Sequence, residues 1–184
     1  NFKGKKVKES NLCKPIGIYG NLKLAGEMMV KSYSHVFKFP YTIVRPSALY
    51  GERCVSRRVS QMFIENALEG KEIIINGDGS EKLDFTYIED LIQGVQKIIN
   101  TKKSQYQTFN ITFGNGRKII DLVKLLKLKF PSLCIKFIPW DKLTPKRGGL
   151  SINKAKNLLK YKPSFKIEVG YKKYINWYKN FYHR

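Results

Sequence analysis

Short runs of β-branched and aromatic residues alternate with helical patterns along the chain, and this alternation restricts the fold more than any other feature. The run YTIVRP at 41–46 ends in a proline and predicts a buried strand, whereas RRVSQMFIENALEG at 57–70 predicts a helix that ends at a glycine. Further strands are expected at 72–76, 83–88, 107–112 and 133–139, and further helices at 17–38, 89–101, 118–130, 151–161 and 166–182. Such alternation is typical of a layered α/β sheet.

The cysteine count and the hydropathy exclude several classes of protein. Cys13, Cys54 and Cys134 are widely spaced, with no C-x-x-C pair and no Cys/His cluster, so we expect neither a disulfide framework nor a metal site. The start of the chain is polar and basic, which is unlike a signal peptide, and no apolar run approaches the ~20 residues that span a bilayer. These features predict a protein of the reducing cytoplasm.

The charge is strongly positive, at +21 for 184 residues, and this attracts polyanions. The lysines are scattered through nearly every segment, and the densest run, KGKKVKES at 3–10, is short. A solvated, lysine-rich surface explains this distribution, and we expect no specific nucleic-acid partner and no membrane partner. Binding of a polyanion stays open as an alternative, which a steep salt dependence of DNA or RNA binding would support.

Tyr19 and Lys23 lie four positions apart at the start of the helix expected at 17–38, which places them on one face, one turn apart. The spacing alone is uninformative, because Tyr41 and Arg45 share it and about two such pairs arise by chance in a chain with 11 tyrosines and 35 basic residues. The chemistry is nevertheless specific. An ammonium group near a tyrosine hydroxyl favours the phenolate, which can take a proton from a sugar hydroxyl while hydride passes to a nicotinamide.

The surrounding motifs give the pair its context. The chain contains, in order, YGNLKLAGE from residue 19, IVRPSALYG from residue 43, IINGDGSEKLDFTYIEDL from residue 74 and RGGLSINKAKNLLKYKP from residue 147. This series resembles the extended short-chain dehydrogenase/reductases, the NAD-dependent sugar-nucleotide epimerase/dehydratase family. The typical runs of that family are Y-G-x-S-K-x-x-x-E, R-P-x-N-x-Y-G and G-D-G-x-x-x-R-D-F-x-x-V-x-D. The resemblance extends from about Pro15 to Tyr178.

The resemblance implies roles for residues at matching positions. Tyr19 matches the catalytic acid/base, and Lys23 matches the residue that assists it and holds the ribose of the nicotinamide; both would contact the cofactor, NAD or NADP. Pro46 matches the position whose backbone lies beside the nicotinamide. Ser47 and Ala48 match residues that face the substrate, a nucleotide-diphosphate sugar that is oxidised transiently to a keto-sugar.

The chain departs from the family runs quoted above at three positions. Ala48 stands where the family has asparagine, and Leu83 stands where it has the arginine before D-F. Lys82 is then the nearest candidate for the phosphates, and Arg147 is a second, because arginine suits bidentate phosphate recognition. Leu22 replaces the serine of Y-G-x-S-K, and we expect it to be a core substitution.

The resemblance also predicts the architecture. It implies a partial Rossmann-like parallel sheet with helices on both faces and a smaller α/β substrate-binding lobe, with residues 1–55 in the core and residues 56–184 mainly in the lobe. No glycine-rich dinucleotide turn occurs, since GDG at 77–79 and GNG at 114–116 are isolated turn signals, so the cofactor-binding half of the family is missing from these residues. The family also implies a homodimer. A non-catalytic, partner-binding fragment of the same fold remains an alternative.

Overall fold

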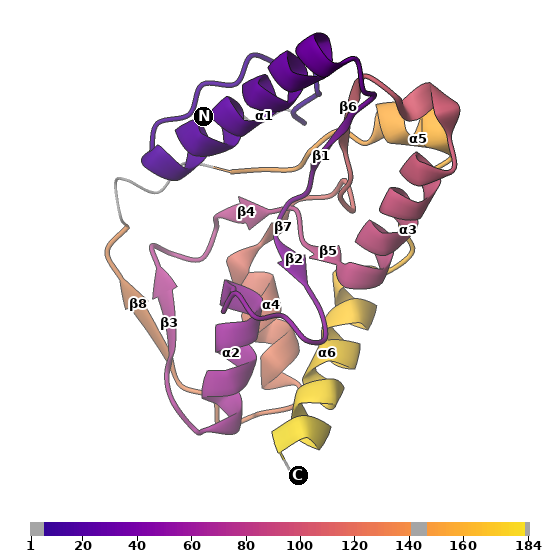
Figure 1. Ribbon diagram of the computed structural model, residues 1–184. Helices are drawn as coiled ribbons and strands as arrows, with labels where there is room; N and C mark the ends of the chain where they lie inside the picture. The colour runs from indigo at the N-terminus through magenta and orange to yellow at the C-terminus, as the bar shows by residue number, and fades with distance from the viewer. Residues whose placement is uncertain (1–5, 141–146, 183–184) are drawn as a thin grey trace.

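The computed structural model describes residues 6–140 and 147–182 as a chain in which helices and short strands alternate (Figure 1). The helices are α1 (Ile18–Phe37), α2 (Val59–Leu68), α3 (Ile88–Ile99), the 3-10 turn η1 (Lys102–Ser104), α4 (Ile119–Lys127), α5 (Asn153–Leu159) and α6 (Ile167–Tyr182). The strands are β1 (Thr42–Arg45), β2 (Leu49–Tyr50), β3 (Ile73–Asn76), β4 (Lys82–Leu83), β5 (Thr86–Tyr87), β6 (Gln107–Asn110), β7 (Arg117–Lys118) and β8 (Ile135–Ile138). The expected α/β class is confirmed.

The strands pair mostly in parallel, as the sequence predicts. β1 pairs with β6 from Thr42 opposite Gln107 to Arg45 opposite Asn110, β2 pairs with β5, and β3 pairs with β8. The β4–β7 pair is antiparallel. Each pair forms a separate two-stranded ladder in the described part of the chain. The β1–β6 ladder joins segments more than sixty residues apart, so the strand expected at 107–112 returns to the strand at 41–46.

One expected element is wrong in detail. The run LDFTYI at 83–88 was expected to form one strand, but it divides into the end of β4 and the separate strand β5. The break falls at Asp84, whose buried carboxylate accepts hydrogen bonds from the Gly114 and Leu150 backbone amides at 3.0 and 2.9 Å. A carboxylate that binds backbone from two other loops fixes this segment outside a regular ladder.

Two apolar cores hold these elements together. The larger core lies among α2, α4 and α6 and contains a cluster of buried aromatic side chains, including Tyr50, Tyr171 and Tyr174. Trp177, on the last turns of α6, packs at the edge of this core and stacks on Phe181 with ring centroids 5.1 Å apart. The smaller core lies where α3 and α5 pack beside β6. The tyrosine-rich C-terminal segment therefore forms a helix, as its spacing predicts, and packs into the larger core.

Helix α1 is the exception to this packing. Ser34 is its one buried residue, and Leu22, Met28 and Val36 are between 62 and 66% exposed. The expectation that Leu22 is a core substitution is therefore wrong for the described chain. These apolar side chains of α1 are open to solvent in the described chain.

No helix in the part of the chain that the structure describes is both long enough and apolar enough to cross a bilayer.

Two helical glycines offer a matched test of this packing. A Cβ at Gly94 in α3 would lie 2.4 Å from Cγ2 of the fully buried Ile111, whereas a Cβ at Gly26 in α1 would meet nothing within 4 Å. We expect Gly94→Ala to lower the free energy of unfolding by about 1–3 kcal/mol through overpacking. Gly26→Ala should raise it by about 0.5–1 kcal/mol, because alanine favours the helix.

Urea unfolding followed by circular dichroism measures both changes. A Gly94→Ala variant as stable as the parent protein would show that α3 is not seated on Ile111 in this way.

Candidate active site

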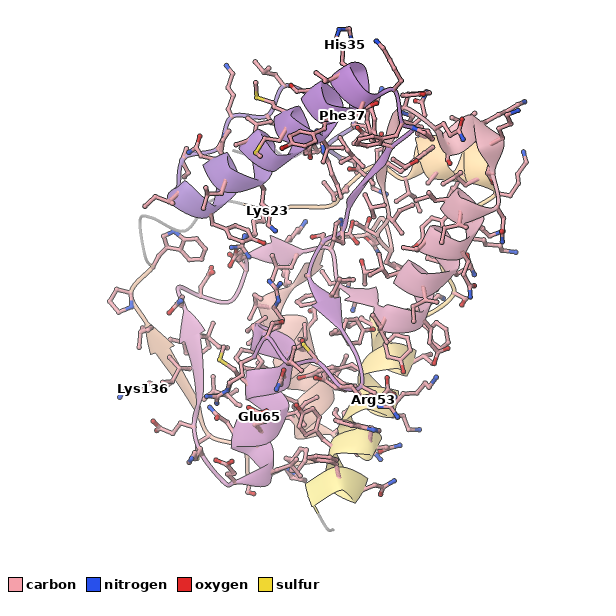
Figure 2. All side chains as sticks on the ribbon, in the orientation of Figure 1. Lys23, His35, Phe37, Arg53, Glu65 and Lys136 are labelled. Carbon is pink, nitrogen blue, oxygen red and sulfur yellow. The ribbon has the colours of Figure 1, made fainter. Side chains whose placement is uncertain are left out.

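Helix α1 places the predicted catalytic pair in its first two turns. The helix begins at Ile18 after Gly17, and the Asn21 side chain donates a hydrogen bond to the Gly17 carbonyl at 3.0 Å. The Lys23 ammonium lies over the Tyr19 ring, 5.3 Å from its centroid, so the two side chains share a face. Tyr19 is 68% exposed, and in Figure 2 Lys23 projects from α1 on the side toward β4. The juxtaposition predicted from the spacing is therefore present.

A bidentate ion pair fastens this helix to β1. Arg45, the last residue of β1, donates from Nε and Nη2 to the two carboxylate oxygens of Glu27, at 2.8 and 2.7 Å. Glu27 follows Lys23 by one turn of α1. The hydrogen bonds from Arg45 hold the pKa of the Glu27 carboxyl below its ordinary value, although partial burial opposes them. The pair fixes α1 relative to the end of the strand that leads to Pro46.

The N-terminal segment closes over the same end of the β1–β6 ladder. Arg45 Nη1 donates to the Glu9 carbonyl at 3.2 Å, and the Glu9 carboxylate accepts a hydrogen bond from the Asn110 backbone amide at 2.9 Å. The Asn110 side-chain amide donates to the carbonyls of Val7 and Ser151. These groups lie at the carboxyl ends of two parallel strands, which is where open α/β sheets bind ligands.

Pro46, Ser47 and Ala48 form the segment that leaves β1. Pro46 is exposed, whereas Ser47 and Ala48 are half-buried. Ala48 has φ 34°, in the region that favours glycine and asparagine, and its carbonyl accepts a hydrogen bond from the Thr86 amide at 3.3 Å. The asparagine of the family pattern would suit this backbone, so the departure at Ala48 leaves a strained residue at the site.

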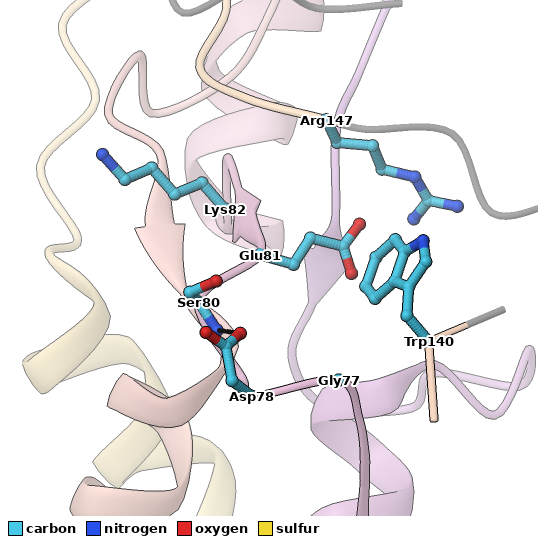
Figure 3. A pocket seen from close by; sticks show the side chains of 7 residues that line it. All are labelled: Gly77, Asp78, Ser80, Glu81, Lys82, Trp140 and Arg147. Atoms are coloured by element: carbon cyan, nitrogen blue, oxygen red, sulfur yellow. Dashed lines mark hydrogen bonds between the residues drawn. The ribbon is translucent and has the colours of Figure 1, made fainter. Parts of the chain in front are cut away.

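Lys82 and Arg147, the two candidates for phosphate binding, line one pocket of about 570 Å3. The other lining residues are Gly77, Asp78, Ser80, Glu81 and Trp140. Figure 3 shows the Glu81 carboxylate directed toward Trp140 and Arg147, while the Lys82 ammonium points away from the Arg147 guanidinium. The structure therefore brings both predicted residues to one cavity, and Arg147 is the cation that faces its aromatic wall.

Buried Asp84 holds together two segments that carry lining residues of this pocket. Its carboxylate accepts hydrogen bonds from the Thr112 hydroxyl at 3.1 Å and from the backbone amides of Gly114 and Leu150. Leu150 follows Arg147 by three residues, so Asp84 connects β4 to the segment that carries the arginine. Burial raises the pKa of Asp84, while these hydrogen bonds oppose the rise. Leu83 points into the larger core and is 5% exposed, so it does not replace the family's arginine at the pocket.

Several residues of the site were not singled out from the sequence. Glu27, Arg45 and Asp84 each occupy a charged position of the family runs quoted above, so a signal for them was present. Glu81 and Trp140 had no comparable signal, because they lie near sixty residues apart and meet only in the folded chain. No group of three or more His, Cys, Asp or Glu side chains in residues 6–140 and 147–182 is arranged to hold a metal ion.

Comparison with known proteins gives consistent matches. The model of the NAD dependent epimerase/dehydratase family matches residues 3–112. A UDP-glucuronate 4-epimerase from Thermodesulfobacterium geofontis is 30% identical over 169 residues, which cover 90% of this chain and 51% of that protein. The chain thus spans about half the length of the curated relatives it matches.

Solved structures agree in fold. The UDP-glucuronic acid 4-epimerase from Bacillus cereus, crystallised with UDP-glucuronic acid and NAD, superposes with a TM-score of 0.92 at 31% identity and covers 99% of this chain and 59% of its own. The UDP-glucose 4-epimerase from Thermotoga maritima, crystallised with UDP-glucose, has a TM-score of 0.90 at 27% identity, covering 99% of this chain and 60% of its own. The fold described above is therefore a partial Rossmann-like one.

The Glu27–Arg45 pair predicts a pH-dependent contribution to stability. Its side chains are 18 and 23% exposed, so we expect Glu27→Gln to lower the free energy of unfolding at pH 7 by about 1–2 kcal/mol. Because the folded-state pKa of Glu27 lies below its ordinary value of 4.5, this contribution is present above pH 4.5 and is lost as the pH falls through the folded-state value. Urea unfolding of both proteins between pH 7 and pH 3 measures the difference.

Glu89→Gln is the matched control, because the Glu89–Lys173 pair is exposed on both sides and should contribute less than about 0.5 kcal/mol. Equal losses in the two variants would contradict an anchoring role for Glu27.

Proposed function

Since this chain belongs to the NAD-dependent epimerase/dehydratase family, we propose that it is the C-terminal part of an NAD(P)-dependent nucleotide-sugar epimerase or dehydratase. In this proposal residues 1–55 contribute the later part of the Rossmann-like core, and residues 56–184 contribute mainly the substrate-binding lobe. The reaction is a transient oxidation of a sugar hydroxyl to a ketone, which prepares the sugar for epimerisation or elimination. Such products are activated sugars of the kind used in polysaccharide synthesis.

The observation that carries the proposal is the Tyr19–Lys23 pair on a helix fastened to the end of β1. The Lys23 ammonium lies 5.3 Å from the centroid of the Tyr19 ring, so the two side chains contact each other. A positioned tyrosine hydroxyl can act as a general base toward a sugar hydroxyl. Tyr19 Oη would take the proton of that hydroxyl and return it when the ketone is reduced.

The residues present fit a nicotinamide cofactor in part. The Lys23 ammonium is exposed and can donate to ribose hydroxyls, and Pro46 follows β1 at the carboxyl end of the sheet, where such cofactors lie. When bound, the cofactor would supply the acceptor for the hydride that leaves the sugar. The chain's own contribution is to orient the ribose through Lys23 and to move the proton through Tyr19.

The pocket lined by Lys82 and Arg147 supports a nucleoside diphosphate as the carrier of the sugar. It combines two cationic side chains with an aromatic one in about 570 Å3. The Bacillus cereus relative was crystallised with UDP-glucuronic acid. We propose that the diphosphate lies against Arg147, with Ser47 and Ala48 facing the sugar.

The exposed face of α1 supports a homodimer. Leu22, Met29, Tyr33 and Val36 are each more than half exposed, and a helix with so little buried surface gains stability by packing against another.

The three cysteines are free, which fits a cytoplasmic location.

Replacement of Tyr19 tests the proposed chemistry. In the complete protein, Tyr19→Phe should lower the rate of keto-sugar formation by about a hundredfold or more, because it removes the group that accepts the proton. Tyr106→Phe is the matched control, since Tyr106 is an exposed tyrosine outside α1 and outside the candidate site. The readout is NADH absorbance in a single turnover. A Tyr19→Phe enzyme that reacts as fast as the Tyr106→Phe enzyme would refute the assignment.

Replacement of Arg147 tests the proposed substrate pocket. Arg147→Ala should weaken UDP binding by about ten- to a hundredfold, because a charge-assisted contact to the diphosphate is lost. Lys166→Ala serves as the control, since Lys166 lines a different pocket. Isothermal titration of UDP gives both affinities, and unchanged binding to the Arg147→Ala protein would place the diphosphate elsewhere.

A further inference from the structure

We propose that Glu81 and Trp140 select the nucleobase: the base stacks on the Trp140 indole, and a ring N–H of the base donates to the Glu81 carboxylate. The inference rests on the proposed function, because it takes the pocket with Arg147 to be the seat of a nucleoside diphosphate. It goes beyond that function by assigning the choice of base to two side chains.

Trp140 provides a fixed aromatic wall. It is half-buried after β8, and its ring packs against Gly77, where an added Cβ would lie 3.1 Å from Cε3 of the indole. Gly77 has φ 69°, and its amide donates to the Ile138 carbonyl at 2.8 Å, which ties the turn after β3 to β8. Only glycine provides both this backbone conformation and the space for the ring. A planar aromatic side chain held in this way is a stacking surface for a base.

Glu81 provides an acceptor that lacks a donor. Its Oε1 is buried and has no hydrogen-bond partner among the described residues. Figure 3 shows the carboxylate directed into the space between Trp140 and Arg147. Burial raises the pKa of Glu81, while the positive charge of Arg147 opposes the rise. Buried acceptors are rarely left unpaired, and a donor on a bound ligand would complete this one.

The chemistry of a carboxylate acceptor favours particular bases. Uracil, thymine and guanine carry a hydrogen on the ring nitrogen of their pairing edge, whereas cytosine and adenine have a lone pair there. At that ring position an ionised carboxylate accepts a hydrogen bond from the first group and meets a lone pair on the second, whose donor on this edge is instead the exocyclic amino group. Asp78 lines the same pocket, but Figure 3 shows its carboxylate turned away from Trp140 and toward Ser80, whose amide donates to Oδ1 at 2.9 Å. Glu81 is therefore the carboxylate available to the base.

UDP and CDP form a matched pair of probes, because they share the ribose and the diphosphate and differ at the pairing edge. In the complete protein we expect UDP to bind at least tenfold more tightly than CDP. Glu81→Gln offers an amide that can donate to cytosine as readily as it accepts from uracil, so it should reduce the ratio of the two affinities by about tenfold or more. Asp78→Asn should leave the ratio unchanged, and Trp140→Ala should weaken both nucleotides to a similar extent, by about tenfold.

Isothermal titration of the two nucleotides into each protein decides the matter. If the parent protein binds UDP and CDP equally, or if Glu81→Gln preserves the ratio, the inference is wrong while the proposed function stands. If neither nucleotide binds the parent protein, the pocket is not a nucleotide site, and both the inference and the proposed substrate fail. Circular dichroism confirms that each variant is folded.

Discussion

The orientation of the candidate active site depends on one bidentate ion pair. Helix α1 carries Tyr19 and Lys23, yet Ser34 is its single buried residue, so apolar packing within the described chain does little to hold it. The two hydrogen bonds from Arg45 to Glu27 attach the middle of the helix to the last residue of β1. Because arginine donates in a planar fork, the pair restricts the angle of the helix as well as its distance from the strand.

Two buried aspartates join separate segments of the fold in a similar way. Asp84 gathers backbone amides from the loop after β6 and from the segment after Arg147, while Asp90 accepts hydrogen bonds from the amides of Ser164 and Phe165 just before α6. Each carboxylate therefore joins segments that are distant in sequence. Charged groups inside this fold organise loops, and the apolar clusters on either side supply the stability.

The sequence predicted the local structure well and the meeting of distant residues less well. The 3.6-residue spacing of apolar residues located six helices, because it reflects the shape of each helix alone. It could not reveal that Leu22 would be exposed, since burial depends on a partner surface, nor that Asp84 would divide LDFTYI, since its partners lie in other loops. For the site, the motifs led to Tyr19, Lys23, Lys82 and Arg147. Glu81 and Trp140 meet in one pocket only through the tertiary structure, so no spacing in the sequence indicates that they are close.

The placement of the two tryptophans has an optical consequence. Trp140 lies in the pocket beside Arg147 and Glu81, whereas Trp177 lies at the edge of the aromatic core on α6, next to Tyr174 and Phe181. The chain has no other tryptophan. Its indole fluorescence therefore combines one emitter beside the candidate site with one packed against the aromatic core. Ligand binding in the pocket of Trp140 should change mainly the first emission, and loosening of the core should change mainly the second, without any added label.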